Sequence, residues 1–509
     1  MTVQRLVERT GALATVTVAV LLGFFAMTDV PIGIFQDDGH YAILARALAH
    51  GDGYRYTNLP GAPAATHFPP GYPLLLTPLW WIAPRFPANV AYLKLVNIAL
   101  LPLAALAIRH LARRLGGLGD VAAIGVALAS IASVPLLYLN GLLFSETAFI
   151  AALFALLVGL ERALMKPRVA PSVLLGWGMA IGATALLRTV GVTLLPAALI
   201  VLAMHRRWRD AALLTAGAMV LLAPWQVWSS VNAHAVPEAI AGGYGGYGPW
   251  LTSAWRTGGA SFIGAVIVEN LRGLLIPLTL FGLETSPPLV KGAATLALLA
   301  LAGAGARQLW ARAPVTVMLL VPYGVLLLLW PFPPDRFLWP LWPILLVMLV
   351  IGVQQWGAAA RPATLRTATR ATAAVALLLV LGWHVRTWPT RSWENGERAN
   401  ARMGLAAAGA AAALPRDGLV ASDQDAMVHL YAGRPAVPLL ALTAEQHVRR
   451  RTDAEVADQL AGVLAAYHPR WVIIAERESL RAAQQLARDG RLRLLAADTA
   501  GVLVYDVVR

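Results

Sequence analysis

Asp37 and Asp38 are adjacent carboxylates in the stretch FQDDGHYAILARALAHGDGY, residues 35–54. They directly follow an apolar segment long enough to cross a membrane. Ionisable groups at the edge of a membrane are costly and are therefore functional candidates. Asp38 has an ordinary alternative role, as the N-cap of the helix predicted by the apolar spacing that follows. Capping leaves Asp37 unexplained, so the pair is a candidate for taking a proton from a hydroxyl group.

Other polar groups are expected at the same outer level of the membrane. They are Glu146 in LNGLLFSETAF, Arg188 in ALLRTVG, Asp335 and Arg336 in PFPPDRFLWP, and His67 before FPPGYP. Each has an ordinary explanation: arginines snorkel to lipid phosphates, a glutamate favours a helix N-terminus, and prolines hold a loop histidine. Arginine also binds phosphate with two parallel hydrogen bonds. If the spans form a bundle, we expect these groups to face one outer cavity suited to transfer from a lipid phosphate to an alcohol.

The composition predicts a polytopic α-helical membrane protein. Of the 509 residues, 58% are hydrophobic and 13% are charged, with mean hydropathy +0.63. A soluble domain usually carries about 25% charged residues. The chain has no cysteine, which excludes disulfides and thiolate chemistry. Nearly all of the net charge of +14 lies in the membrane part, which holds 26 basic and 13 acidic residues, whereas residues 390–509 hold 15 basic and 14 acidic residues. This distribution argues against nucleic-acid binding.

Eleven apolar runs are expected to be membrane spans, although the pair 171–187 and 190–204 is short and could be divided differently. They cover residues 11–30, 88–108, 120–139, 144–161, 171–187, 190–204, 211–230, 289–306, 315–331, 337–355 and 371–388. Basic clusters at 109–114, 162–168, 206–209, 307–312 and 361–370 are expected in the cytoplasm with the N-terminus. Because the number of spans is odd, the C-terminus is expected on the extracytoplasmic side. The membrane is expected to be the bacterial cytoplasmic membrane.

Two outer loops are large, at residues 31–87 and 231–288. The second contains AGGYGGYGPW, residues 241–250, which is either a disordered connection or a mobile lid whose aromatic rings stack on sugars. Residues 263–285 are apolar but contain Glu269, Asn270 and Arg272, and we interpret them as a re-entrant or surface-lying helix.

The chain divides into a membrane domain at 1–389 and a small soluble α/β domain at 390–509. In the second domain, residues 417–425, 469–476 and 500–508 have the pattern of short buried strands. Residues 478–490 have the pattern of an amphipathic helix closed by a glycine. No catalytic motif is evident in this domain.

Several motifs occur in the order found in a known superfamily. QDDGHYAILARALAHGDGY, HFPPGYPLLL, FSETAF, LLRTVGVTLLP and DRFLWPLWPILL together resemble the GT-C glycosyltransferases. The nearest branch is the protein O-mannosyltransferase and aminoarabinose-transferase group, families 39 and 83. The resemblance covers the membrane part. It implies a GT-C fold and a donor sugar on a polyprenyl phosphate, such as undecaprenyl or decaprenyl phosphate, used at the outer face.

The resemblance also implies roles for individual residues. Asp37 is expected to be the general base, and Asp38 a second acidic residue that positions the base or the acceptor. The family usually has Asp-Glu at this pair, so Asp38 is a shorter carboxylate. Arg188 and Arg336 match arginines that hold the donor phosphate, and His67 takes the place of a basic residue before the proline pair.

Further substrate-binding candidates are Glu146, Tyr41, Tyr72, Tyr244 and Tyr247. The implied reaction inverts the anomeric centre, with a hydroxyl of a protein, lipid or glycan as acceptor. Two arginines can stabilise the leaving phosphate, so no cofactor is required, although a divalent metal is compatible. The sugar and the acceptor depend on loop shape and are left open.

Two other functions fit parts of the pattern. A secondary transporter places its charges near the midplane and often has repeated halves, whereas here the charges cluster outside and no repeat is found. A ligase or flippase for lipid-linked glycans would not use a monophosphate donor. Sugar transfer from a lipid phosphate supports the transferase, and vesicle uptake of a free solute supports the transporter.

Overall fold

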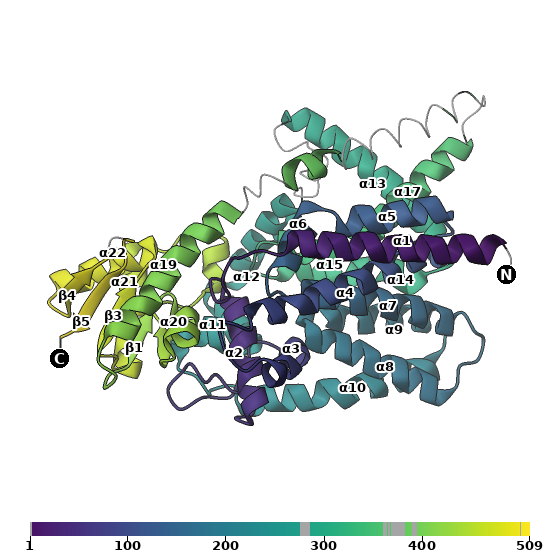
Figure 1. Ribbon diagram of the computed structural model, residues 1–509. Helices are drawn as coiled ribbons and strands as arrows, with labels where there is room; N and C mark the ends of the chain where they lie inside the picture. The colour runs from purple at the N-terminus through teal and green to yellow at the C-terminus, as the bar shows by residue number, and fades with distance from the viewer. Residues whose placement is uncertain are drawn as a thin grey trace. The chain divides into compact units, whose positions relative to one another are not determined.

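The computed structural model describes residues 3–274, 286–359, 364, 367, 382–388, 394–498 and 500–508. The chain forms two compact units that alternate along the sequence. One unit consists of Met1–Met27, Asn97–Pro224 and Ile267–Arg391, and the other of Thr28–Val96, Trp225–Val266 and Ser392–Arg509. Figure 1 labels helices and strands of both units and colours the chain by residue number.

The first unit is built from apolar helices. They are α1 (Val3–Ala26), most of α4 (Val90–His110), α5 (Asp120–Ile131), α6 (Val134–Gly141), α7 (Glu146–Leu164), α8 (Pro171–Leu187), α9 (Leu194–Met204), most of α10 (Trp208–Val231), α13 (Pro288–Trp310), α14 (Pro314–Met318), α15 (Leu320–Leu329), α16 (Asp335–Leu338) and α17 (Trp342–Ala359). Short connecting turns lie at Leu111–Leu115, Thr189–Thr193 and Trp339–Leu341.

Six of the described helices are long and apolar enough to cross a membrane, or seven if a bent pair counts as one span. Shorter apolar helices cover Pro171–Leu187, Thr189–Met204 and Pro314–Leu329. The predicted count of eleven is not confirmed, and most of the predicted span 371–388 lies outside the described residues. The coarser prediction, a multi-pass helical membrane protein, is confirmed.

The apolar run predicted as the span 120–139 is present, but it is bent. The structure breaks it into α5 and α6, which meet at an angle of 56°. Pro135 lies in the first turn of α6. Proline has no backbone N–H and excludes a continuous helical hydrogen-bond ladder at this point. The apolar pattern continues through the break, so hydropathy alone does not show it.

Helices α13 and α17 pack through small residues. A Cβ atom added at Gly305 would lie 1.8 Å from the carbonyl oxygen of Met348, and one at Gly352 would lie 2.1 Å from that of Leu301. The two backbones therefore approach too closely for any side chain at either position. Figure 1 shows α13 and α17 next to each other. Close backbone approach through glycine is a usual device of helix association in membranes, where apolar burial alone gives no advantage over lipid.

The second unit combines outer-loop helices with an α/β sheet. Its helices are α2 (Gln36–His50), α3 (Gly71–Ile82), α11 (Ala241–Tyr244), the first part of α12 (Tyr247–Gly273), α19 (Glu394–Ala413), α20 (Asp425–Ala432), α21 (Asp453–Tyr467) and α22 (Arg477–Arg488). Single 3₁₀ turns lie at Glu238–Ile240 and Ala444–His447.

The sheet has five strands in the order β2-β1-β3-β5-β4. They are β1 (Val420–Ser422), β2 (Ala436–Pro438), β3 (Trp471–Ile474), β4 (Leu492–Ala497) and β5 (Leu503–Val507). Strand β1 is parallel to both β2 and β3, whereas β5 is antiparallel to β3 and β4. Helix α19 packs on the sheet core through Ala407 and Ala411 (Figure 1).

The predicted strands at 417–425, 469–476 and 500–508 are confirmed as β1, β3 and β5, and the predicted helix at 478–490 as α22. Two strands were missed. Strand β2 has only three residues and ends in a proline, and β4 is mostly exposed at the sheet edge. Pro435 and Pro438 around β2, and the charged Arg493 within β4, weaken the strand pattern in the sequence.

Most of the Gly/Tyr stretch 241–250 is helical, so its interpretation as a disordered connection is wrong, and its role as a mobile lid stays a prediction. Residues 241–244 form α11, and α12 begins at Tyr247. A Cβ atom at Gly242 would lie 1.7 Å from the carbonyl oxygen of Leu442. Glycine here permits close packing, which a flexible linker would not require. The surface-lying helix predicted at 263–285 is helical to Gly273, and residues 275–285 lie outside the described residues.

Candidate active site

The acidic pair lies in the first turn of α2. The helix begins at Gln36 with Phe35 as its N-cap, so the prediction that Asp38 is the N-cap is wrong. Asp38 is the third helical residue, and its carboxylate reaches back over the helix start. It accepts hydrogen bonds from the backbone N–H groups of Gly33 at 2.9 Å, Phe35 at 3.0 Å and Gly39 at 2.8 Å. A carboxylate in the first turn satisfies N–H groups that the helix itself leaves unbonded.

Asp38 is held in place and shielded from solvent, with 2% of its surface exposed. Burial raises the pKa of Asp38 to about 7, although the three backbone N–H groups oppose the shift. The folded protein therefore binds a proton here that the unfolded chain releases at lower pH. The contribution of this group to stability is present at acidic pH and is lost as the pH rises through about 7. Its contacts and burial give Asp38 a positioning role.

Asp38→Asn is expected to lower the free energy of unfolding by about 1–3 kcal/mol, because an amide offers one acceptor oxygen where the carboxylate offers two. One of the buried N–H groups would then face an amide N–H₂. The thermal unfolding midpoint of the purified protein in detergent measures the effect. Asp52→Asn, an exposed change in the same outer loop, is the matched control. Equal midpoints for the two variants would contradict this role for Asp38.

Asp37 differs from its neighbour in burial. Asp37 is partly exposed to solvent, whereas Asp38 is buried. The two carboxylates are thus divided between a solvent-accessible position and a structural one. A carboxylate that is to accept a proton from a substrate must be reachable by that substrate. Within the pair, only Asp37 meets this condition.

His67 lies on the same unit and is buried, with 6% exposed. Its Nδ1 atom is 2.8 Å from the carbonyl oxygen of Gly245, so this nitrogen carries the proton and donates. Burial lowers the pKa of His67 below its usual value, which makes the ring neutral at pH 7. The ring of Tyr247 lies beside it, with the two ring centroids 4.3 Å apart.

The other three predicted tyrosines are buried in aromatic packing. Tyr41 contacts Tyr72 with ring centroids 4.9 Å apart, and both are at most 4% exposed. Tyr244 is 1% exposed and donates its hydroxyl proton to Asp425, while Asn58 donates to the Tyr244 oxygen at 2.5 Å. These side chains join the first outer loop, α11 and α20 into one packed cluster.

Lys94 was missed by the sequence analysis. Its ammonium group is 2% exposed and donates to the carbonyl oxygens of Thr28 at 2.9 Å and Val30 at 2.6 Å. It therefore fixes the chain just before the acidic pair. A single lysine within an otherwise apolar span was the signal available in the sequence, since a buried cation needs such partners.

Glu146, Arg188 and Arg336 meet in the first unit. Glu146 is the first residue of α7 and is fully buried. Its Oε1 atom pairs with Arg188 Nη1 at 2.6 Å and with Nε of Arg336. Arg188 also donates to Ser145 Oγ at 3.2 Å. One carboxylate thus holds two guanidinium groups, which neither snorkelling nor helix capping accounts for.

The two arginines differ in accessibility. The Arg188 side chain is 8% exposed and that of Arg336 is 29% exposed. Arg336 lies over the ring of Phe144, with its Cζ atom 4.1 Å from the ring centroid. Two guanidinium groups beside one carboxylate leave an excess of positive charge, which suits a phosphate group. Whether this cluster shares one cavity with Asp37, as the sequence analysis expects, stays a prediction.

Comparisons with known proteins give matches among solved structures. No family model matches the chain, and no curated protein matches it. The chain is similar to the archaeal oligosaccharyltransferase AglB from Archaeoglobus fulgidus, solved with an inhibitory peptide and a dolichol-phosphate. The match has 14% identity and a TM-score of 0.54, and covers 99% of this chain and 75% of that one.

The chain also matches ArnT from Cupriavidus metallidurans bound to undecaprenyl phosphate, with 17% identity, a TM-score of 0.49 and coverage of 97% and 98%. ArnT in the apo state matches with 15% identity, a TM-score of 0.45 and coverage of 97% of each chain. The similarity to AglB carries the assignment of fold. The chain therefore shares the fold of the AglB structure.

Proposed function

We propose that the chain is an inverting glycosyltransferase that moves a sugar from a polyprenyl phosphate to a hydroxyl group. The reaction takes place at the outer face of the bacterial cytoplasmic membrane, where the proposal also places the domain at 390–509. The observation that carries the proposal is the difference in burial between the two carboxylates of the acidic pair, on a GT-C fold. Asp38 is buried and bonded to three backbone N–H groups, which leaves Asp37 as the accessible carboxylate.

Asp37 acts as the general base in this proposal. The acceptor oxygen attacks the anomeric carbon while its proton passes to the Asp37 carboxylate. The bond between the anomeric carbon and the phosphate oxygen breaks, and the lipid phosphate leaves with the electron pair. Attack from the face opposite the leaving group inverts the anomeric centre.

Arg188 and Arg336 hold the donor phosphate. The leaving phosphate gains negative charge as the glycosidic bond breaks, and fixed positive groups stabilise that charge. Glu146 orients both guanidinium groups before the donor arrives. Preorganisation of this kind lowers the cost of binding because the arginine side chains are already ordered. The dolichol-phosphate in the AglB structure supports a lipid-phosphate ligand for this fold.

The histidine and tyrosine candidates contact the substrates or stabilise the helix that carries the acidic pair. Neutral His67 and the adjacent Tyr247 present an imidazole and a phenol ring to the sugar or acceptor. The buried rings of Tyr41, Tyr72 and Tyr244 keep α2 in position. The sugar and the acceptor class are not specified by these contacts.

A second candidate function is supported by the similarity to AglB, an oligosaccharyltransferase. In that case the donor carries a larger glycan, and the same chain acts as a lipid-linked glycan ligase. Both candidates form a glycosidic bond, so they differ in the donor that is consumed.

Sugar transfer by the purified full-length protein tests the proposed activity. A radiolabelled polyprenyl-phosphate sugar is incubated with the protein and an envelope extract, and label in the lipid, protein and polymer fractions is measured after extraction. We expect label to move from the donor lipid into one acceptor fraction. Uptake of a free labelled solute into proteoliposomes, without transfer from the lipid donor, would support a transporter and overturn the proposal.

A further inference from the structure

A pocket of the second unit lies at the carboxyl ends of the parallel strands β1 and β3. It has a volume of about 230 Å³. Asp423 follows β1 and Glu476 follows β3, and both line the pocket. The chain leaves β1, passes through α20 and forms β2 on one side of β1. It then passes through α21 and forms β3 on the opposite side of β1. The strand order thus reverses between β1 and β3, and ligands of α/β sheets bind outside strand ends at such a switch point.

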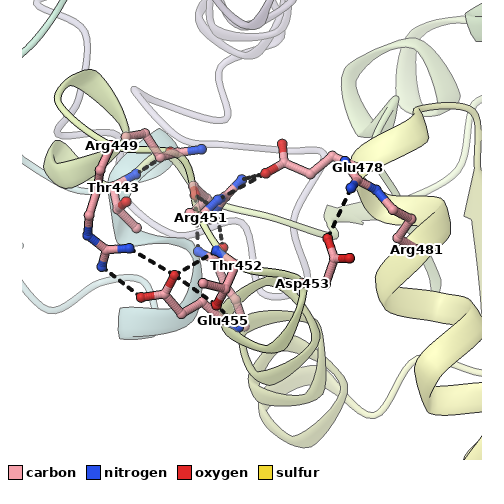
Figure 2. Close-up of polar contacts among 11 residues, drawn as sticks. Thr443, Arg449, Arg451, Thr452, Asp453, Glu455, Glu478 and Arg481 are labelled. Carbon is pink, nitrogen blue, oxygen red and sulfur yellow. Dashed lines mark hydrogen bonds and ion pairs between the residues drawn. The ribbon is translucent and has the colours of Figure 1, made fainter.

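The lining of this pocket is strongly acidic. Asp423, Asp425, Glu476 and Glu478 contribute four carboxylates, whereas Arg451 is the one guanidinium among the lining residues. Arg451 is already bound elsewhere: it pairs with Glu478 at 3.1 Å and donates to the carbonyl oxygen of Ala441 at 3.0 Å and to Gln459. Figure 2 shows Arg451 turned to Glu478 within this network.

The same network anchors the helix beside the pocket. Thr452 caps α21, where its hydroxyl accepts from the Glu455 backbone N–H at 3.2 Å and the Glu455 carboxylate accepts from the Thr452 N–H at 2.8 Å (Figure 2). Arg449 pairs with Glu455 at 2.7 Å. These contacts fix the chain on either side of Arg451, so its guanidinium has little freedom to turn towards the other carboxylates.

Neutral donors hold the remaining carboxylates. Asp423 accepts from the backbone N–H groups of Ala475 and Glu476 at 2.8–3.1 Å. Asp425 accepts from Tyr244, and Glu476 accepts from the Gln424 amide at 3.1 Å. These bonds orient the oxygens without cancelling their charge. The pocket therefore offers a ligand many hydrogen-bond acceptors and a net negative charge.

His40 gives a second and independent indication of a ligand. The residue lines the pocket and is 1% exposed, and its Nδ1 atom has no hydrogen-bond partner among the residues the structure describes. The imidazole ring of His40 packs edge-on against the ring of Tyr244, with the two ring centroids 4.4 Å apart. Burial lowers the pKa of His40 to about 3, so the ring is neutral and has one nitrogen that accepts a hydrogen bond. A buried polar atom without a partner is uncommon in native proteins and calls for an explanation.

We infer that this pocket binds the primary ammonium group of a small ligand. An ammonium group has three N–H donors, no acceptor and one positive charge, which complements carboxylates and a neutral imidazole. A hydroxyl ligand would supply donors but no charge, and an anion would be repelled. The pocket volume limits the ligand to a small molecule. The inference concerns binding and does not depend on the transfer reaction.

Calorimetric titration of the full-length protein in detergent with 2-aminoethanol tests the inference, and ethylene glycol is the uncharged probe of the same size. We expect 2-aminoethanol to bind and ethylene glycol not to bind under the same conditions. At pH 8, above the pKa of about 7 to which burial raises Glu476, Glu476→Gln should weaken 2-aminoethanol binding about tenfold or more, because a charge-assisted hydrogen bond becomes a neutral one. Asp489→Asn, an exposed change just after α22, is the matched control and should leave the affinity unchanged.

The pH dependence gives a second readout. Burial raises the pKa values of Asp423 and Asp425 to about 6 and that of Glu476 to about 7, so these carboxyls lose their protons between about pH 5 and pH 8. The ammonium probe keeps its charge over this range, and its binding should strengthen as the pH rises. Equal binding of both probes, no binding of 2-aminoethanol, or displacement of it by a tightly bound calcium ion would each overturn the inference. An unchanged affinity in Glu476→Gln would do the same.

Discussion

Asp37→Asn is expected to lower the rate of sugar transfer by about 10²–10⁴-fold, the usual contribution of a general base. The substitution keeps the size of the side chain and its place in α2 but removes the carboxylate that takes the acceptor proton. Asp38 cannot replace it, because its oxygens are bonded to three backbone N–H groups. Initial rates with a polyprenyl-phosphate sugar, at saturating acceptor, measure the change.

Measuring donor binding by the Asp37→Asn protein shows whether a loss of activity comes from the missing base or from misfolding. The Asp37→Asn protein should bind polyprenyl phosphate with the wild-type affinity and unfold at the wild-type temperature, since its fold and its arginines are intact. Asp52→Asn, in the same outer loop, is the matched control and should retain full activity. If Asp37→Asn turned over within about fivefold of the wild-type rate, Asp37 would not be the base.

Glu146→Gln has the largest expected effect on stability. Glu146 is fully buried and pairs with both Arg188 and Arg336. Removing one partner of a buried ion pair costs about 3–5 kcal/mol, because the remaining charges are left uncompensated. Arg188, with 8% of its side chain exposed, has little solvent to replace the lost carboxylate. The thermal midpoint in detergent should fall by several degrees.

A surface ion pair provides the control for this second prediction. Glu269 is 45% exposed and pairs with Arg272, which is 73% exposed, at 3.1 Å. Exposed pairs of this kind contribute about 0–1 kcal/mol, so Glu269→Gln should change the midpoint little. A Glu146→Gln protein as stable as Glu269→Gln would show that the Glu146 cluster is not a compensated buried network.

The sequence alone predicted elements wherever one pattern decides local structure. The helix predicted after the acidic pair is α2, which ends at His50 and is capped by Gly51 with a backbone φ of 84°. The buried strands β1, β3 and β5 were recognisable from their apolar runs. Spans were recognisable as apolar segments, but the break between α5 and α6 was not, because it depends on proline geometry and does not interrupt the apolar pattern.

The candidate site was less accessible to sequence reasoning. The sequence and the family resemblance suggested different roles for Asp37 and Asp38, but the contacts that hold Asp38 on the backbone of the preceding turn depend on the fold. Glu146 was recognised as a candidate, but its pairing with two arginines arises from packing among separate helices. The acidic pocket left no local signal, since Asp423 and Glu476 come together only through the parallel pairing of β1 and β3.

The central claim is that a polyprenyl monophosphate sugar is the donor, and the stoichiometry of the reaction tests it most directly. Free polyprenyl phosphate and transferred sugar are quantified in one reaction of the purified protein, with the monophosphate and diphosphate forms of the donor compared side by side. We predict one polyprenyl phosphate released for each sugar transferred, and no transfer from the diphosphate donor. Transfer from the diphosphate donor alone would contradict the claim and support the lipid-linked glycan ligase.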